Sequence, residues 1–140
     1  CCTPLRYNLN YRNYFYVTGG KISIKLVSPH YSKYLYENKD YDNFEFSSPL
    51  NLWDIQDKYK GNYNKVKVLD VVLNAGTIIH IPAYWWFTIK YDELSSICCF
   101  NYRTYMNFLT ISPHIFQSIL QNQNIKLETF NKYDDIKKKE

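Results

Sequence analysis

The sequence predicts a mainly β protein, an antiparallel sandwich or barrel, with one helix near its carboxyl end. Short apolar or alternating runs return at close intervals between residues 13 and 102, separated by turns rich in Gly, Asn, Asp or Pro. After residue 112 the apolar residues recur at helical spacing instead. A chain of 140 residues fits one compact unit. We therefore expect a β domain over residues 1–111, followed by a helix and a charged tail over residues 112–140.

The first two expected strands lie between Asn13 and Val27. The run NYFYVT precedes Gly19 and Gly20, and KISIKLV follows them with its apolar residues at alternate positions. Two glycines between alternating runs supply the positive φ angles that a tight turn needs. The pattern therefore predicts a β-hairpin.

The alternation stops between Ser28 and Gly61. Pro29, Pro49 and many Asn, Asp and Tyr residues predict a long ordered loop, with one short helix near residues 52–59. A loop of this length inside a compact domain is usually functional or covers the mouth of a barrel.

Strand signals then return in close order. The four expected strands are Lys65 to Leu73, Thr77 to Ile81, Trp85 to Tyr91 and Ser95 to Tyr102. After them Ser112 offers a helix N-cap, and Pro113 suits the first helical position. We expect a helix over residues 113–123 with one apolar face on the sheet or on another subunit, and a loose charged tail from about residue 132.

Charge and composition narrow the function classes. The net charge of +4 comes from basic residues that are scattered along the chain until the closing lysines, whereas a nucleic-acid footprint clusters on one face. No apolar run is long enough to span a membrane. The 15 Tyr residues, with abundant Asn, Ile and Lys, indicate an AT-rich genome such as that of a large DNA virus or a protist. We therefore expect neither nucleic acid nor a membrane as the main partner.

Four cysteines form two adjacent pairs, Cys1-Cys2 and Cys98-Cys99. This spacing suits neither a disulfide framework nor a zinc site. We expect Cys98 and Cys99 to pack as small apolar residues on a strand. A reducing, intracellular compartment is the expected location.

Three segments carry a resemblance to a known family. IIHIPAYWWF (78–87), TPLRYN (3–8) and SPLNLWD (48–54) resemble segments of JmjC or cupin-type oxygenases, iron(II)- and 2-oxoglutarate-dependent enzymes, and most closely the asparaginyl-hydroxylase type. The resemblance implies a double-stranded β-helix, a cupin or jelly-roll-like barrel. The family barrel begins before the TPLRYN strand, so we expect the barrel to be incomplete at its amino end, with an open sheet edge unless a partner chain or another segment covers it.

The resemblance places the family's three iron ligands, two histidines and a carboxylate, at Arg6, Asn8 and Phe87. Arginine remains protonated and repels a cation, the asparagine amide is a weak neutral donor, and phenylalanine has no lone pair. We therefore expect no metal, no catalytic residue and no cofactor, although the family uses iron(II) and 2-oxoglutarate.

The pocket for the oxo-acid is better preserved at the level of residue type. By resemblance it would contain Thr3, Lys21, Asn101 and, if one residue is deleted, Asn13. Lys21 is equally well explained as a strand lysine that reaches water. Arg6 is either a structural plug between tyrosines, a partner for an acid from the long loop, or part of a small-anion site. His30, His80 and His114 have no ligand partners at a suitable spacing and are expected to be structural.

Together these observations favour a catalytically inactive cupin-like domain that acts as a structural or protein-interaction module, for example in a virion or another large assembly. Its expected partners are other proteins or further copies of itself. One alternative is a 2-oxoglutarate-dependent oxygenase with an unorthodox metal site. A third hypothesis uses the lysines and tyrosines of residues 31–41 to stack and hold single-stranded nucleic acid.

Overall fold

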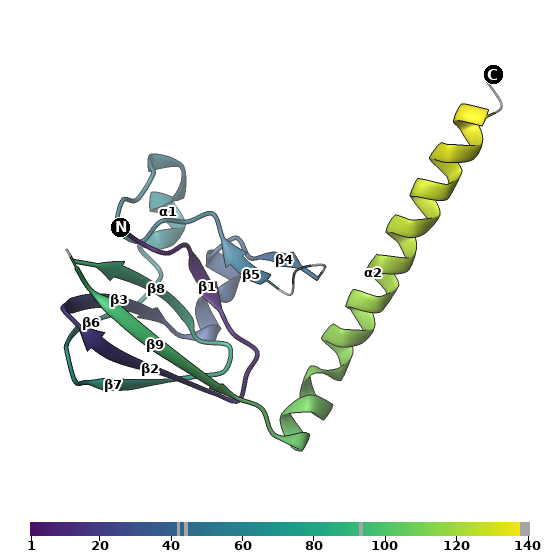
Figure 1. The fold of residues 1–140 in the computed structure, drawn as a ribbon. Coiled ribbons are helices and arrows are strands. Elements are labelled where there is room, and N and C mark those ends of the chain that lie inside the picture. The colour runs from purple at the N-terminus through teal and green to yellow at the C-terminus, as the bar shows by residue number, and fades with distance from the viewer. Residues whose placement is uncertain (42, 44, 93, 138–140) are drawn as a thin grey trace.

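Two β-sheets face each other, and a long helix leaves them at the carboxyl end (Figure 1). The computed structural model describes the backbone of residues 1–41, 43, 45–92 and 94–137, and the side chains of these up to residue 123. The six-stranded sheet has the order β4-β5-β1-β8-β3-β6, and the three-stranded sheet has the order β7-β2-β9. The strands are β1 (Leu5–Tyr7), β2 (Arg12–Gly19), β3 (Lys21–Val27), β4 (Asn38–Asp40), β5 (Glu45–Ser48), β6 (Val68–Asn74), β7 (Ile78–Pro82), β8 (Trp86–Tyr91) and β9 (Ser96–Tyr102). This arrangement confirms the mainly β fold with a carboxyl-terminal helix.

An inner core fills the space between the two sheets. Strand alternation sends every second side chain of β2, β3 and β8 into it. Its buried members are Phe15, Val17, Ile22, Ile24, Leu26, Ile81, Phe87 and Ile89.

A second core lies on the outer face of the six-stranded sheet. There the segment between β3 and β6 packs over the alternate residues of β1 and β8. Its buried members are Leu5, Tyr7, Leu9, Val27, Leu35, Phe46, Leu50, Leu52, Tyr59, Val66, Trp86 and Ile111. The six-stranded sheet is thus covered on both faces, and the first four residues of β8 are all buried.

The predicted hairpin around Gly19 and Gly20 is wrong. β2 pairs with β7 and β9, whereas β3 pairs with β6 and β8 in the other sheet. The two glycines therefore form a corner between sheets. Gly20 has φ +74°, and a Cβ there would lie 2.8 Å from the carbonyl oxygen of Leu94, so the corner needs both the conformation and the small size of glycine.

The predicted long loop contains more structure than its pattern indicated. It forms η1 (Pro29–Tyr34), β4, β5, η2 (Asp57–Tyr59) and α1 (Lys60–Tyr63), the last two close to the predicted short helix. β5 pairs with β1, which extends the six-stranded sheet. The two expected roles of this loop were a functional loop or a cover for the barrel mouth; in the structure the segment covers mainly the outer face of that sheet. Tyr31, Tyr34 and Tyr41 pack against the outer core, so their rings hold this cover in place.

The four later strands are confirmed, each within three residues of its predicted start. β6 and β7 lie in different sheets, and the turn between them contains Gly76 at φ +87°. β9 lies at an edge of the smaller sheet, where Cys98 and Cys99 are exposed. The expected burial of these two cysteines is therefore wrong, because no described strand covers that edge.

The long helix α2 (Tyr105–Lys137) starts earlier than predicted. Its cap is Thr104, whose hydroxyl accepts a hydrogen bond from the Asn107 amide at 3.2 Å. Pro113 lies inside the helix, where proline cannot donate to the carbonyl of Leu109; the Ser112 hydroxyl donates to that carbonyl instead, at 2.7 Å. Ser112 and Pro113 thus continue the helix that they were predicted to begin.

The carboxyl tail was expected to be loose from about residue 132. The helix continues to Lys137, and residues 138–140 lie outside the described part. No helix in the described residues combines the length and apolarity needed to cross a membrane.

Candidate functional site

Two of the three predicted metal-ligand positions face each other. Arg6 on β1 and Phe87 on β8 are paired residues of neighbouring antiparallel strands. The Arg6 guanidinium carbon lies 5.7 Å from the centre of the Phe87 ring, which is a cation–π contact. Phe87 is completely buried in the inner core, while Arg6 is exposed. Arg6 was expected to be stacked between tyrosines. In the structure it lies over the ring of Phe87 instead.

The third ligand position, Asn8, lies just beyond β1. Its side-chain amide donates to the Asn13 side chain at 3.3 Å. Asn13 is buried, and its own amide donates to the carbonyls of Asn10 and Ile81 at 3.1 and 3.2 Å. These bonds hold the connection between β1 and β2 against β7. Both asparagines therefore have internal partners.

The predicted oxo-acid residues are not brought into one pocket. Asn101 is paired with Asn13 across β2 and β9, but Asn101 is exposed. The Thr3 hydroxyl accepts the Ile89 amide at 2.9 Å, so it continues the β1–β8 pairing. Lys21 is exposed and alternates with Ile22, which points into the inner core, so the lysine lies on the opposite face.

An open groove of about 690 Å³ begins one strand away from Phe87. Leu26 on β3 is paired with Phe87 on one side and with Leu69 on the other, and both leucines line the groove. The remaining lining residues are Ser28, His30, Tyr31, Lys67, Val68 and Trp85. The groove could not be predicted from the sequence, because its residues come from three separate segments that only the strand pairing brings together.

The charge of Arg6 acts on two further side chains, Cys99 on β9 and Tyr91 on β8. Cys99 is exposed as a residue, but partial burial of its thiol raises the thiol pKa, and the Arg6 cation acts in the opposite sense. Burial also raises the pKa of the Tyr91 phenol, where Arg6 again opposes the shift. Arg6 therefore lies near β9 as well as β8. A raised pKa disfavours the thiolate form of Cys99.

The residues present do not fit the iron site of the resembled oxygenases. A guanidinium and an aromatic ring face each other where two imidazoles would be needed. Within the described residues, no three His, Cys, Asp or Glu side chains gather closely enough to hold a metal ion.

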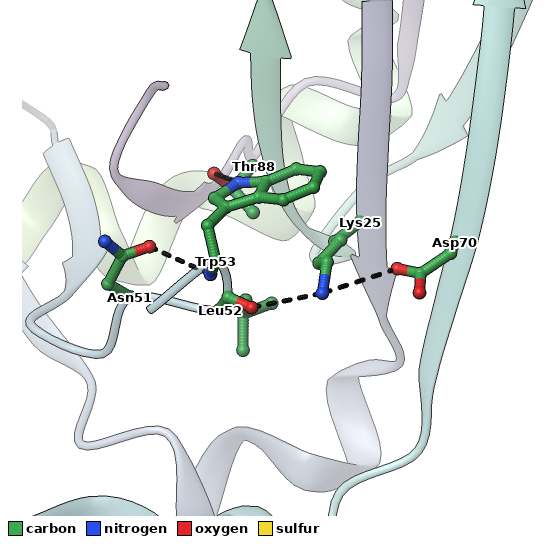
Figure 2. A network of polar contacts seen from close by, with 6 residues as sticks. All are labelled: Lys25, Asn51, Leu52, Trp53, Asp70 and Thr88. Carbon is green, nitrogen blue, oxygen red and sulfur yellow. Dashed lines mark hydrogen bonds and ion pairs between the residues drawn. The ribbon is translucent and has the colours of Figure 1, made fainter. Parts of the chain in front are cut away.

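The outer face of the same sheet carries a polar network centred on Trp53 (Figure 2). The Trp53 indole donates to the Thr88 hydroxyl at 3.0 Å, and that hydroxyl donates to the Thr3 carbonyl at 2.6 Å. Lys25 lies 4.8 Å from the Trp53 ring centre and donates to the Leu52 carbonyl at 3.1 Å. Through these contacts the segment SPLNLWD (48–54), one of the three that resemble the oxygenase family, is held against β3 and β8.

The three histidines lie apart from one another. The His80 ring on β7 lies 4.9 Å from the Tyr14 ring in a tilted arrangement, and the His114 ring on α2 stacks on the Tyr41 ring at 6.0 Å between ring centres. His30 lies at the groove.

A family model described as a cupin-like domain matches residues 2–108, which is most of the chain. No curated protein matches the sequence. The match covers both sheets and the start of α2.

Proposed function

We propose that this chain, which belongs to the cupin-like domain family, is a catalytically inactive member that acts as a structural or protein-interaction module. The observation that carries the proposal is the contact between Arg6 and Phe87, 5.7 Å from the guanidinium carbon to the ring centre. A permanent cation and a hydrocarbon ring occupy positions that would have to supply neutral nitrogen ligands. Asn8, at the third position, is engaged by Asn13.

The long helix supports the interaction part of the proposal. One face of α2 packs on the β domain through Asn107 and Ile111, which are buried, and through Ser118, which donates to the Tyr41 carbonyl at 2.9 Å. The opposite face carries uncharged side chains at alternating spacings of four and three residues, the spacing of a helix–helix seam. They are Tyr105, Leu109, Ser112, Phe116 and Ile119.

This opposite face is exposed. Phe116 and Ile119 keep 62% and 52% of their surface accessible, although helices usually bury their apolar stripe. Because the seam carries no charge, two copies can meet along it without repulsion between like charges, and we propose that two copies of the chain pair through it. A reducing intracellular location, in a virion or another large assembly, fits four exposed cysteines that are all free.

Metal binding tests the proposed loss of catalysis. We expect calorimetric titration of the metal-stripped protein with Mn(II), with and without 2-oxoglutarate, to show no binding. The triple variant Arg6→His, Asn8→Asp, Phe87→His is the matched control, because it restores the three ligand types at the same positions. Tight binding to the unmodified chain, strengthened by 2-oxoglutarate, would favour an oxygenase with an unorthodox metal site.

Sedimentation velocity tests the proposed pairing. We expect the chain to sediment as a dimer and Phe116→Glu to sediment as a monomer, because a charge would enter an apolar seam. Gln117→Glu adds the same charge at the neighbouring exposed position and should leave the dimer intact. A monomeric unmodified chain would rule out pairing through α2.

A further inference from the structure

The groove at the end of β3 and the start of β6 exposes apolar surface from the inner face of the larger sheet. Leu26 and Leu69 are paired across these two strands, so their side chains lie on the same face. Leu26 is buried, whereas Leu69 keeps 55% of its surface exposed. Further along β6, Val71 and Leu73 pack against the inner core. The space between the sheets is therefore closed along most of β6 and open at Leu69.

The groove is built from internal segments of the chain. Its walls come from residues 26–31, from residues 67–69 and from Trp85. In the larger sheet, β8 and β3 lie between β6 and β1. β6 is followed directly by β7 of the smaller sheet, so the chain itself joins the two sheets on this side. The walls of the groove thus all come after β1 in the chain, and β6 lies on the side of the larger sheet away from β1.

Polar groups surround the apolar floor of this groove. Among the described residues, none forms a hydrogen bond or ion pair with the side chains of Ser28, His30, Tyr31, Lys67 or Trp85, all of which line the groove. Each of these side chains has an N–H or O–H group that can donate a hydrogen bond. The rim of the groove therefore suits a ligand that accepts hydrogen bonds.

The charge and the size of the groove narrow the class of ligand. Of the described residues that line it, none is Asp or Glu, and Lys67 carries a positive charge. Its volume of about 690 Å³ is that of a small-molecule site, and such sites combine a mostly apolar lining with a few polar groups. Trp85 contributes a flat aromatic wall. A flat apolar body with one negative group matches these features.

We propose that the groove binds a small aromatic carboxylic acid, whose ring packs against Leu69 and Trp85 and whose carboxylate accepts a hydrogen bond from Lys67. The hydroxyl groups at the rim supply further donors to the same carboxylate. This site adds small-molecule binding to the proposed interaction module. Neither Arg6 nor Phe87 lines the groove, so the site does not depend on the loss of the iron ligands.

Three probes that differ only in charge test the proposal. 3-Phenylpropionate is the acid, and 3-phenylpropan-1-ol and 3-phenylpropylamine keep its ring and chain. NMR of the tryptophan indole N–H groups measures binding at about pH 8, where the acid is ionised and the amine is protonated. The Trp53 and Trp86 indoles donate to Thr88 and Ser32 at 3.0 and 2.7 Å, so their signals are internal references. Loss of a signal in Trp85→Phe identifies that of Trp85.

We expect 3-phenylpropionate to bind with a Kd on the order of 1 mM and to shift the Trp85 signal alone. The amine should bind about tenfold more weakly, because like charges at an interface are disfavoured. Lys67→Glu should reverse this preference, and Lys67→Gln should abolish it. Lys21→Glu makes the same charge change at the opposite end of β3 and should leave the preference unchanged. Leu69→Ser removes part of the apolar floor and should weaken all three probes alike.

Three results would overturn the proposal. The first is an unchanged Trp85 signal with 3-phenylpropionate at up to on the order of 10 mM. The second is equal binding of the acid and the amine. The third is a Trp85 signal that changes with protein concentration in Phe116→Glu, whose helix seam is blocked, because a second copy would then occupy the groove. None of these results bears on Mn(II) binding, so failure here and failure of the proposed loss of catalysis can be told apart.

Discussion

β8 and β9 are neighbours in sequence and opposites in environment. Both are short, uninterrupted strands, and both were predicted from the same kind of signal. β8 lies inside the six-stranded sheet between β1 and β3, with both faces covered by cores. β9 lies at an edge, with all but one of its residues exposed. The comparison teaches that a strand's contribution to stability depends on its place in the sheet, which an apolar run does not reveal.

Replacing a large side chain on each strand gives the largest expected contrast. Trp86 is completely buried, contacts Tyr7 at 4.7 Å between ring centres and donates to Ser32 at 2.7 Å. We expect Trp86→Ala to lower the free energy of unfolding by about 3–5 kcal/mol. Phe100→Ala on β9, where the ring is 47% exposed, should cost less than about 1 kcal/mol. Urea unfolding of the two variants checks this, and similar losses would contradict the comparison.

The corner between the two sheets is the next test. Gly20→Ala puts a methyl group 2.8 Å from the Leu94 carbonyl in addition to the strain of a positive φ, whereas Gly76→Ala adds strain alone because nothing lies within 4 Å of its Cβ. We expect Gly20→Ala to lower the free energy of unfolding by about 2–3 kcal/mol and Gly76→Ala to lower it by about 1 kcal/mol. Thermal unfolding of both variants measures the difference, and equal losses would show that the approach to Leu94 is not a constraint.

The polar network on the outer face of β8 should have a smaller effect. Thr88→Val leaves the Thr3 carbonyl and the Trp53 indole without their partner, at an expected cost of about 1–2 kcal/mol. Trp53→Phe removes the indole donor of the same hydrogen bond. The double variant Trp53→Phe, Thr88→Val should therefore lose less unfolding free energy than the sum of the two single losses. Urea midpoints of the three variants form the cycle, and strict additivity would mean that the hydroxyl and the indole are not coupled.

Alkaline pH provides the smallest expected effect. Burial, and then the hydrogen bond to Glu37, raise the pKa of Tyr7 well above its usual value. The folded state therefore keeps a proton that the unfolded state loses above about pH 10, so stability is unaffected below that pH and falls as the pH rises further. Tyr7→Phe lacks this proton. Its difference in unfolding free energy from the unmodified chain should shrink by up to about 1.4 kcal/mol per pH unit above pH 10. A constant difference between pH 9 and 11 would contradict the assignment.

The fold was predictable where local pattern and global position agree. The strands after residue 65 have apolar runs bounded by turn residues, and they were located well. Alternation around Gly19 and Gly20 gave two strands correctly but could not tell a hairpin from a corner, because both need the same backbone freedom. β4 and β5 gave too few alternating residues to be detected.

The candidate site was predictable in part. What limited the prediction was which face of a strand each side chain occupies. Arg6 and Phe87 could be placed together because a family pattern fixes which two strands carry them. Lys21 could not, because a shift of one residue moves a strand side chain to the opposite face, and the structure puts Ile22 inward. The groove at Leu26, Leu69 and Trp85 depends on β3–β6 pairing, which no local signal specifies.

The hydroxyl of Ser112 has a mechanical consequence. It occupies the position where Pro113 leaves the Leu109 carbonyl without a backbone donor, and such turns are where helices bend. The helix from Pro113 to Lys137 is roughly 36 Å long at about 1.5 Å per residue, so a change of about 10° at this turn moves the far end by about 6 Å. The orientation of the part of α2 that follows Pro113, relative to the β domain, is therefore sensitive to the geometry of the turn at Ser112 and Pro113.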